Sequence, residues 1–208
     1  MFEKKHRVHF NTETVNKGHH QITYRGIKAI KCPFDYVMYQ MLIWDLKPDL
    51  ILEIGTNKGG TALYFADLLD LIGKGEIHTI DIEKDQSDPI LKTHPRIKTF
   101  VEGYQGYDLS LAKGFNTILV IEDGSHTYED TIAAVKKFAP LVSLQSYLIV
   151  EDGIIDELKL TKKYNGGPLK AIDEFLAGND AFIIDQKWCN MFGINATFNV
   201  DGFLKRIK

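Results

Sequence analysis

Short apolar runs alternate with amphipathic segments along most of this chain, and that alternation limits its fold more than any other feature. The predicted strands span residues 50–54, 76–82, 97–102, 117–121 and 146–150, and the helices predicted between them span residues 60–71, 107–113 and 128–141. This order is typical of a parallel sheet covered by helices. We therefore expect an α/β fold.

The residues before the first predicted strand differ from this pattern. The first 30 residues are polar and show no sustained periodicity, so we expect them to form an arm or lid. Apolar side chains in residues 33–46 approximate a helical stripe, and Pro48 should end that helix. A single domain is therefore expected over residues 31–208, behind an arm of residues 1–30.

The pattern changes again after Gly153. Residues 168–176 are expected to form a helix, and residues 182–185 and 196–207 to form two final strands, the last with a turn at Asp201 and Gly202. The polar stretch 154–167 is expected to be a loop, either a mobile flap or a simple excursion of the chain between two elements.

Composition narrows the classes of function. With 208 residues, 44% of them hydrophobic, the chain can bury one sheet-centred core, while a net charge of −3 disfavours a nucleic-acid partner. No long apolar run or signal peptide is present, so we expect a soluble cytoplasmic protein with no membrane partner. Cys32 and Cys189 lie far apart without metal-ligand spacing, which suggests reduced thiols.

A glycine turn follows the first core strand. The segment from Glu53 reads E-x-G-x-x-x-G-G, with Gly55, Gly59 and Gly60, and differs from the G-x-G-x-x-G of dinucleotide sites. Asp81 lies about 20 residues further on, where an acid accepts hydrogen bonds from ribose hydroxyls. Together they predict an adenosine-sized site in which Glu53 binds a ligand's amine. In the alternative interpretation, the glycines only shape a turn and Asp81 only caps the next segment.

Carboxylates end the next two core strands. Glu122 and Asp123 follow one strand and Glu151 and Asp152 follow the other, so they should meet in one crevice. Crowded like charges need a cation or a shared proton, and oxygen ligands favour Mg²⁺. We therefore expect Asp123, Glu151 and Asp152 to bind Mg²⁺. In the alternative interpretation, Asp123 caps the helix that begins near Tyr128, and Glu151 and Asp152 are solvated loop acids. His126 could be a general base, a cofactor contact or a structural histidine.

Several stretches of the sequence, taken together, are specific enough to indicate a protein family. They are YRGIKAIKCPFDYVMYQ, with Gly26, Lys31, Pro33, Asp35 and Tyr39; PDLILEIGTNKGGTALYFADLL; IHTIDI; the D-x-x-H of Asp123 to His126; YLIVED; and the ending GPLKAIDEFLAGNDAF with NVDGFLKRI. This set resembles the cephalosporin hydroxylase and rhamnosyl O-methyltransferase family of class I methyltransferases. The resemblance covers nearly all of the chain after about Tyr24.

The resemblance implies a Rossmann-like class I methyltransferase fold, with a seven-stranded, mostly parallel sheet, an antiparallel last strand and helices on both faces. It implies an S-adenosylmethionine site formed by Glu53, Gly55, Thr56, Gly59, Gly60, Thr61, Asp81, Ile82, Gly103 and Asp123. The metal ligands Asp123, Glu151 and Asp152 are also similar to those of catechol-type O-methyltransferases. One departure is that Tyr104 and Gln105 stand where the family often has a small polar residue, so they are not assigned to the cofactor site.

The reaction implied is methyl transfer from S-adenosylmethionine to a hydroxyl of a small molecule, such as a sugar or another polyhydroxylated metabolite. Mg²⁺ would bind and orient the acceptor oxygen. His126 is the first candidate base, and Lys31 the alternative if burial lowers its pKa. The competing hypotheses are a metal-dependent hydroxylase or other oxidoreductase on the same fold, and a non-catalytic cofactor-binding module. A homo-oligomer is possible, with the arm covering its own site or a neighbour's.

Overall fold

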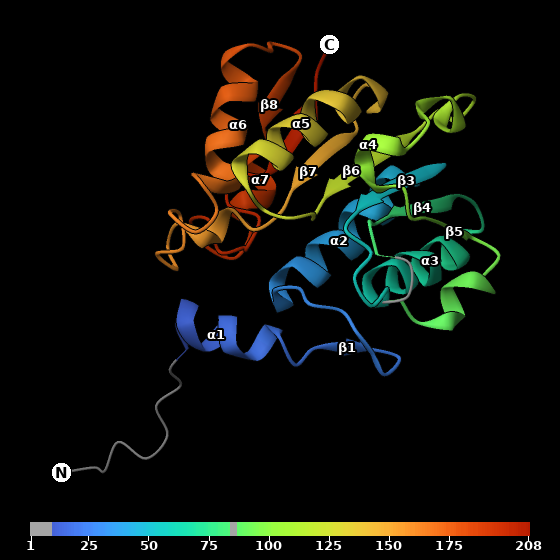
Figure 1. The fold of residues 1–208 in the computed structure, drawn as a ribbon, viewed down its shortest axis with the longest axis horizontal. Coiled ribbons are helices and arrows are strands. Elements are labelled where there is room, and N and C mark those ends of the chain that lie inside the picture. The colour runs from blue at the N-terminus through green and yellow to red at the C-terminus, as the bar shows by residue number, and fades with distance from the viewer. Residues whose placement is uncertain (1–9, 84–86) are drawn as a thin grey trace.

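A seven-stranded sheet runs through the centre of the computed structural model, which describes residues 10–83 and 87–208 (Figure 1). The strands, in the sheet order β5-β4-β3-β6-β7-β9-β8, are Ile97–Phe100, Glu76–Ile80, Leu50–Ile54, Ile118–Glu122, Tyr147–Val150, Phe203–Arg206 and Phe182–Ile184. Neighbours from β5 to β7 are parallel, whereas β9 is antiparallel to both β7 and β8. The predicted, mostly parallel sheet with an antiparallel last strand is confirmed.

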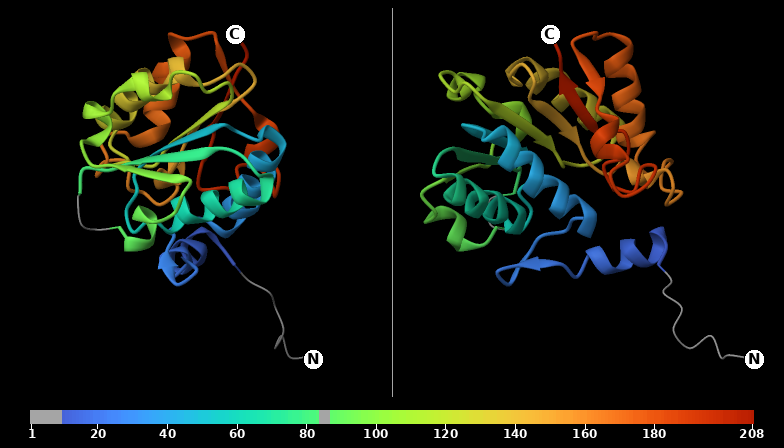
Figure 2. Two further views of the ribbon diagram at one scale, coloured as in Figure 1. Left: turned by 90° about the vertical axis from the view of Figure 1, so that its right-hand side faces the viewer. Right: turned by 180° about the vertical axis from the view of Figure 1, so that it is seen from behind.

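The central strands are apolar on both sides because helices cover both faces of the sheet. All five residues of β3 are buried, and their side chains alternate between two separate cores. Helices α2 (Pro33–Leu46) and α3 (Gly60–Ile72) share one core with the short α7 (Gln186–Cys189). Helices α5 (Tyr128–Phe138) and α6 (Gly167–Ala177) share the other, on the opposite face (Figure 2).

Local sequence fixes where these helices begin and end. α2 begins at Pro33 and ends before Lys47, which is left-handed at φ 48°. α3 is bounded by Gly59 and Gly73, both with positive φ. The Thr127 side chain caps α5 by accepting a hydrogen bond from the Asp130 amide. The boundaries predicted for these three helices lie within a few residues of the observed ones.

The N-terminal arm contains regular structure that the polar pattern did not predict. Helix α1 (Thr12–His19) is followed by a two-stranded hairpin of β1 (Thr23–Tyr24) and β2 (Ile27–Lys28). The hairpin packs on α3, where the Tyr24 hydroxyl donates to Asp67 at 2.7 Å. α1 lies beyond the end of α2, outside the sheet layers (Figure 1).

Several element boundaries differ from the predicted ones, and side-chain hydrogen bonds explain some of the differences. The helix predicted over residues 107–113 is instead a single turn, α4 (Gly103–Gly106), followed by the 3₁₀ turn η2 (Leu109–Ala112). The Asp108 side chain accepts from the Ser110 amide and so starts a new turn. β4 ends at Ile80 rather than residue 82 because the Asp81 carboxylate accepts from the Ile82 amide.

Of the strand predicted over residues 196–207, only β9 (Phe203–Arg206) forms. The Asp35 carboxylate accepts hydrogen bonds from the Thr197 hydroxyl and the Phe198 amide, so that amide is not available to a sheet. Further 3₁₀ turns are η1 (Pro89–Lys92), η3 (Ala139–Leu141) and η4 (Gly153–Ile155). No helix within the described ranges is long and apolar enough to cross a membrane.

Candidate functional site

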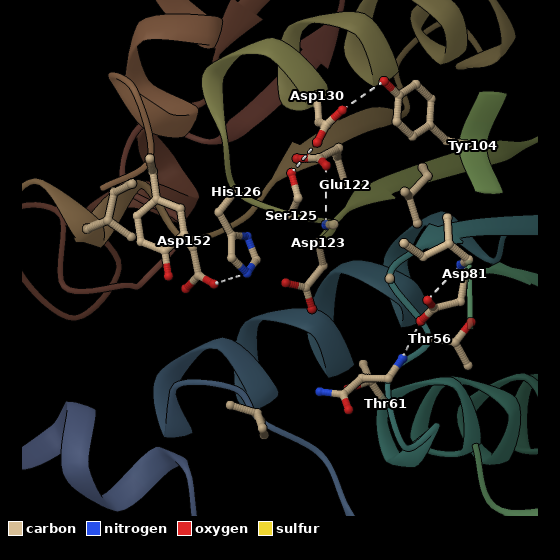
Figure 3. Close-up of a pocket in the computed structure, with 18 of the residues that line it drawn as sticks. Thr56, Thr61, Asp81, Tyr104, Glu122, Asp123, Ser125, His126, Asp130 and Asp152 are labelled. Carbon is tan, nitrogen blue, oxygen red and sulfur yellow. Dashed lines mark hydrogen bonds and ion pairs between the residues drawn. The ribbon is translucent and has the colours of Figure 1, made fainter. Parts of the chain in front are cut away.

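A cavity of about 690 Å³ opens at the carboxyl ends of β3, β4, β6 and β7, where the strand order reverses between β3 and β6 (Figure 3). Ligands of open α/β sheets bind at such a position. One end of the cavity is lined by the glycine turn and the residues after β4 and β5. The other end is lined by α1 and by residues 154–164, with Asp123, His126 and Asp152 between the two ends.

The first end contains most of the predicted cofactor residues. Gly55, Thr56, Thr61, Asp81, Ile82, Gly103 and Asp123 all line the cavity. Gly55 has φ 103°, and a Cβ there would lie 1.9 Å from the Asp123 carbonyl oxygen, so no other residue fits. The Asp81 carboxylate accepts from the Asn57 amide at 2.9 Å and from the Ile82 amide at 2.7 Å. This acid is therefore held in place before any ligand binds.

Gly59 and Gly60, which were also predicted to contact the cofactor, are not among the residues that line the cavity. A Cβ on Gly59 would lie 2.3 Å from Leu91, and one on Gly60 would lie 2.3 Å from the Lys28 carbonyl oxygen. These glycines are needed because η1 and β2 approach the start of α3 closely. Their role in this structure is to pack the turn.

Glu53 is also outside the cavity lining and lies buried in β3. Its Oε2 accepts from the Thr79 hydroxyl at 2.6 Å, which is itself 2.6 Å from the Thr56 hydroxyl on the cavity wall. Its Oε1 has no hydrogen-bond partner among the described residues. Burial raises the pKa of Glu53 to about 8.

Tyr104 and Gln105, which were not assigned to the cofactor site, line the same end of the cavity. The Tyr104 hydroxyl donates to Asp130 at 3.3 Å, so its ring stands against the start of α5 (Figure 3). Glu122, Ser125 and Asp130 are further lining residues that received no role from the sequence. The signal that could have found them is their closeness to Asp123 in sequence: Glu122 ends β6, Ser125 follows it, and Asp130 lies in the first turn of α5.

Lys31 is the one buried cation among the carboxylates within the described ranges. Its ammonium lies 3.1 Å from Asp123 Oδ2 and also forms an ion pair with Glu151 Oε1. Burial alone would lower the pKa of Lys31, but Asp123 and Glu151 outweigh it and raise the pKa above its ordinary value. The lowered pKa that a Lys31 base requires is therefore not found, because the two carboxylates stabilise the ammonium.

Asp123, His126 and Asp152 bring one ligand atom each within 4.8 Å of one another. Glu151, the third predicted ligand, instead points to Lys31 and accepts from the Tyr39 hydroxyl at 2.6 Å. The predicted triad is thus split: Asp123 and Asp152 face the cavity, while Glu151 does not line it. Two carboxylates and an imidazole at this spacing fit a divalent cation, and the crowding of acids favours one.

His126 faces Asp152, with its Nε2 3.2 Å from Oδ2 (Figure 3). Its Nδ1 is buried and has no hydrogen-bond partner among the described residues. Burial lowers the pKa of His126, but Asp152, Asp123 and Glu122 outweigh burial and raise it. Both His126 and Asp152 have φ 59°, a conformation that costs non-glycine residues energy and is frequent at functional sites.

The other end of the cavity was not foreseen in detail. α1 contributes Asn16, His19 and the adjacent His20, and the segment after β7 contributes Leu158 and Tyr164. The Tyr164 ring lies 6.1 Å from the His126 ring, edge to face. This wall combines apolar, aromatic and hydrogen-bonding side chains next to His126. Two segments that appeared only polar in the sequence therefore meet over one end of the cavity.

Comparisons with known proteins agree with this geometry. The family described as Rhamnosyl O-methyltransferase/CmcI matches residues 16–207. A rhamnosyl O-methyltransferase of Mycobacterium tuberculosis (strain H37Rv) is 32% identical over 197 residues, which cover 88% of this chain and 78% of the relative. One from Mycobacterium leprae is 28% identical over 204 residues, with 88% and 82% covered.

Solved structures are similar to this chain in fold. A CmcI structure with Mg and SAM has a TM-score of 0.67 at 22% identity and covers 91% of this chain and 78% of its own. An SAH-bound methyltransferase of Podospora anserina has a TM-score of 0.59 at 18% identity, with 98% and 99% covered. These likenesses place the fold among the class I methyltransferases, as the sequence predicted.

Proposed function

Because the chain belongs to the Rhamnosyl O-methyltransferase/CmcI family and is an S-adenosylmethionine-dependent O-methyltransferase with a small-molecule acceptor, we propose the roles of its residues and the class of its acceptor. The acceptor is a hydroxyl of a sugar or another polyhydroxylated metabolite. The relatives' names support this class, and so does the cavity wall of polar and aromatic side chains beside His126.

The observation that carries the cofactor assignment is the Asp81 carboxylate, which two backbone amides fix on the cavity wall. Asp81 accepts hydrogen bonds from the ribose hydroxyls, and the backbone of Gly55 lines the same end of the cavity, where the adenosine binds. Thr61, Ile82, Gly103, Tyr104 and Gln105 complete this end of the cavity. When bound, S-adenosylmethionine supplies the electrophilic methyl group.

The carboxylates between the two ends form the second part of the proposal. Asp123 and Asp152 hold a divalent cation, Mg²⁺ by the preference of oxygen ligands, and Glu151 joins them if Lys31 releases it. When bound, the ion supplies Lewis-acid stabilisation of the acceptor oxygen. Asp123 reaches both the cofactor end and this cluster, so it helps to bring donor and acceptor together.

His126 receives the proton of the acceptor hydroxyl. It stands at the border of the two ends of the cavity, and Asp152 orients its imidazole through Nε2. Tyr164 and the apolar side chains near it exclude water from this border. Lys31 keeps its proton and acts through Asp123 and Glu151, whose positions it fixes.

Calorimetric titration with S-adenosylhomocysteine tests the cofactor site. The wild type should bind it in preference to NAD, and Asp81→Ala should weaken binding by about ten- to a hundredfold, the loss of one charge-assisted hydrogen bond. Asp173→Ala removes an exposed acid on α6, away from the cavity lining, and is the matched control. Equal affinity of the two variants would refute the assignment.

Turnover in the presence and absence of Mg²⁺ tests the metal site. Activity should be lost in excess chelator and restored by added Mg²⁺, while S-adenosylhomocysteine still binds. Asp152→Asn should raise the Mg²⁺ concentration needed for turnover, because a neutral amide is a weaker ligand than a carboxylate. Full activity in excess chelator would exclude a metal from the reaction.

A further inference from the structure

Helix α2 is apolar on two opposite sides, which is unusual for a helix in the outer layer of a domain. Its inner side packs Met38, Tyr39, Leu42 and Ile43 against the sheet, where all four are buried. Its outer side carries Phe34, Val37, Met41 and Trp44, which we call the α2 seam. Figure 2 shows α2 on the outside of its layer, with no described helix covering it.

The seam is exposed although it is apolar. Val37, Met41 and Trp44 are 45%, 40% and 53% exposed, and Phe34 is half-buried. Charged side chains are absent from these four positions. A row of large apolar side chains in water is costly, and a contiguous one marks an interaction surface. In the described part of the chain, the contacts on the seam are at its two ends, where Phe10 and Phe192 lie against Phe34 and the Lys47 ammonium lies over the Trp44 ring.

More apolar surface adjoins the seam at its N-terminal end. Phe192 stacks on Phe34 with ring centroids 5.2 Å apart, and the Phe10 ring lies 6.4 Å from Phe34 on another side. Phe10 and Phe192 are themselves 65% and 47% exposed. The seam therefore continues into an aromatic cluster formed by three separate segments of the chain.

We propose that the α2 seam is a dimer interface and that its partner is a second copy of this chain, with the two α2 helices antiparallel. The seam residues are spaced three, four and three apart, and this spacing reads the same in both directions. A two-fold axis beside Tyr39 therefore places Phe34 opposite the partner's Trp44, and Val37 opposite the partner's Met41. Spacing of this kind also forms the seam of paired helices in coiled coils.

The size of the surface supports this partner. With about 150–250 Å² for each aromatic side chain, the exposed parts of the seam and the aromatic cluster amount to on the order of 500 Å² per chain. Two chains would thus bury about 1,000 Å² in total, the smallest area expected of a specific interface.

Charge is complementary in the same arrangement. The antiparallel pairing brings the exposed Asp45 near the partner's Pro33, the first residue of the partner's α2. A carboxylate is favoured at the positive end of a helix. A parallel pairing would instead place the two Asp45 side chains together at the same end.

Sedimentation velocity over a range of concentrations tests the interface. The wild type should sediment as a dimer, and Met41→Lys should weaken dimerisation at least about a hundredfold, because it places an unpaired charge in an apolar seam. Leu71→Lys is the matched control: Leu71 is 76% exposed on α3, outside the seam, and its replacement should leave the dimer intact. A monomeric wild type, or a Met41→Lys variant as dimeric as Leu71→Lys, would overturn the proposal.

Disulfide trapping tests the antiparallel register. Val37→Cys and Met41→Cys chains, each alone, should form no interchain disulfide, because identical positions are offset by about 6 Å along the axis in addition to the separation of the helices. An equimolar mixture should give covalent heterodimers on non-reducing gels. The wild type, whose Cys32 and Cys189 are buried, shows the background. Covalent dimers from either variant alone, or none from the mixture, would exclude this register.

Discussion

At the scale of single residues, the site depends on how a few charges are shared. Lys31 is the buried cation between Asp123 and Glu151, and the Tyr39 hydroxyl adds a second donor to Glu151. Leaving a buried charge unpaired costs far more than losing an exposed pair. Lys31 therefore holds Asp123 and Glu151 in place whether or not a ligand is bound.

Lys31→Met should lower the free energy of unfolding by about 3–5 kcal/mol in the absence of metal, since it leaves Asp123 and Glu151 without their partner. Mg²⁺ should then stabilise this variant more than the wild type, because the cation no longer competes with an ammonium. Urea unfolding with and without Mg²⁺ measures both effects. Lys136→Met, which breaks the solvent-exposed pair with Glu174, should lower the free energy of unfolding much less than Lys31→Met does. Equal losses in the two variants would contradict the buried-pair role.

His126→Ala should lower kcat by about 10²- to 10⁴-fold if His126 is the general base, the usual span for such catalysis. S-adenosylhomocysteine affinity should hardly change, because Asp81 and Gly55 remain. Steady-state kinetics and calorimetry on the same variant separate these effects. A matching loss of Mg²⁺ affinity would instead make His126 a metal ligand, and an unchanged kcat would make it structural.

At the scale of elements, the turn between β3 and α3 is shaped by its neighbours. Gly60 begins α3 directly against the backbone of β2, where a Cβ would lie 2.3 Å from the Lys28 carbonyl oxygen. The glycine turn thus joins the arm to the domain, a role that the sequence motif alone does not reveal. The consequence is that the turn should be sensitive to small substitutions that do not face the cavity.

Gly60→Ala should lower the free energy of unfolding by about 1–3 kcal/mol, because β2 must move away from α3. Gly18→Ala is the opposite case: it lies in α1, nothing lies within 4 Å of a Cβ there, and alanine is the better helix former. Its stability should be unchanged or slightly higher. Thermal unfolding of the two variants compares them, and similar behaviour would argue against the close contact.

At the scale of the whole molecule, the cavity is enclosed by segments that lie far apart in the sequence. α1 and the hairpin come from the first 30 residues, and residues 154–164 follow β7. A ligand in this cavity contacts parts of the chain that are far apart in sequence. Its binding should therefore stabilise the molecule as a unit.

S-adenosylhomocysteine at about a hundred times its dissociation constant should stabilise the native state by about 2.7 kcal/mol. For a chain of this size that corresponds to a rise of Tm by roughly 5–10 °C. Thermal melts measure it, with NAD at the same concentration as the control. Asp81→Ala, with its affinity lowered about ten- to a hundredfold, should keep only about 0.4–1.4 kcal/mol of this stabilisation at the same ligand concentration. A shift of equal size with NAD would refute the selectivity of the site.

The sequence by itself determined the order of the core strands and of the helices α2, α3, α5 and α6, the parallel core of the sheet and the candidate residues at the strand ends. It could do so because periodicity, glycine turns and strand-ending acids are local signals that survive without knowledge of the fold. Asp81, Asp123 and His126 were all identified in this way and all line the cavity.

Only the tertiary structure decided which of these residues meet. It separated Glu151 from Asp152, although they are adjacent in sequence, because Lys31 and Tyr39 from distant segments hold the Glu151 carboxylate. It also shortened the last strand, since Asp35 uses the Phe198 amide, and raised the pKa of Lys31, which burial alone would have lowered. Each outcome depends on contacts between residues far apart in the chain, and a local pattern carries no information about such contacts.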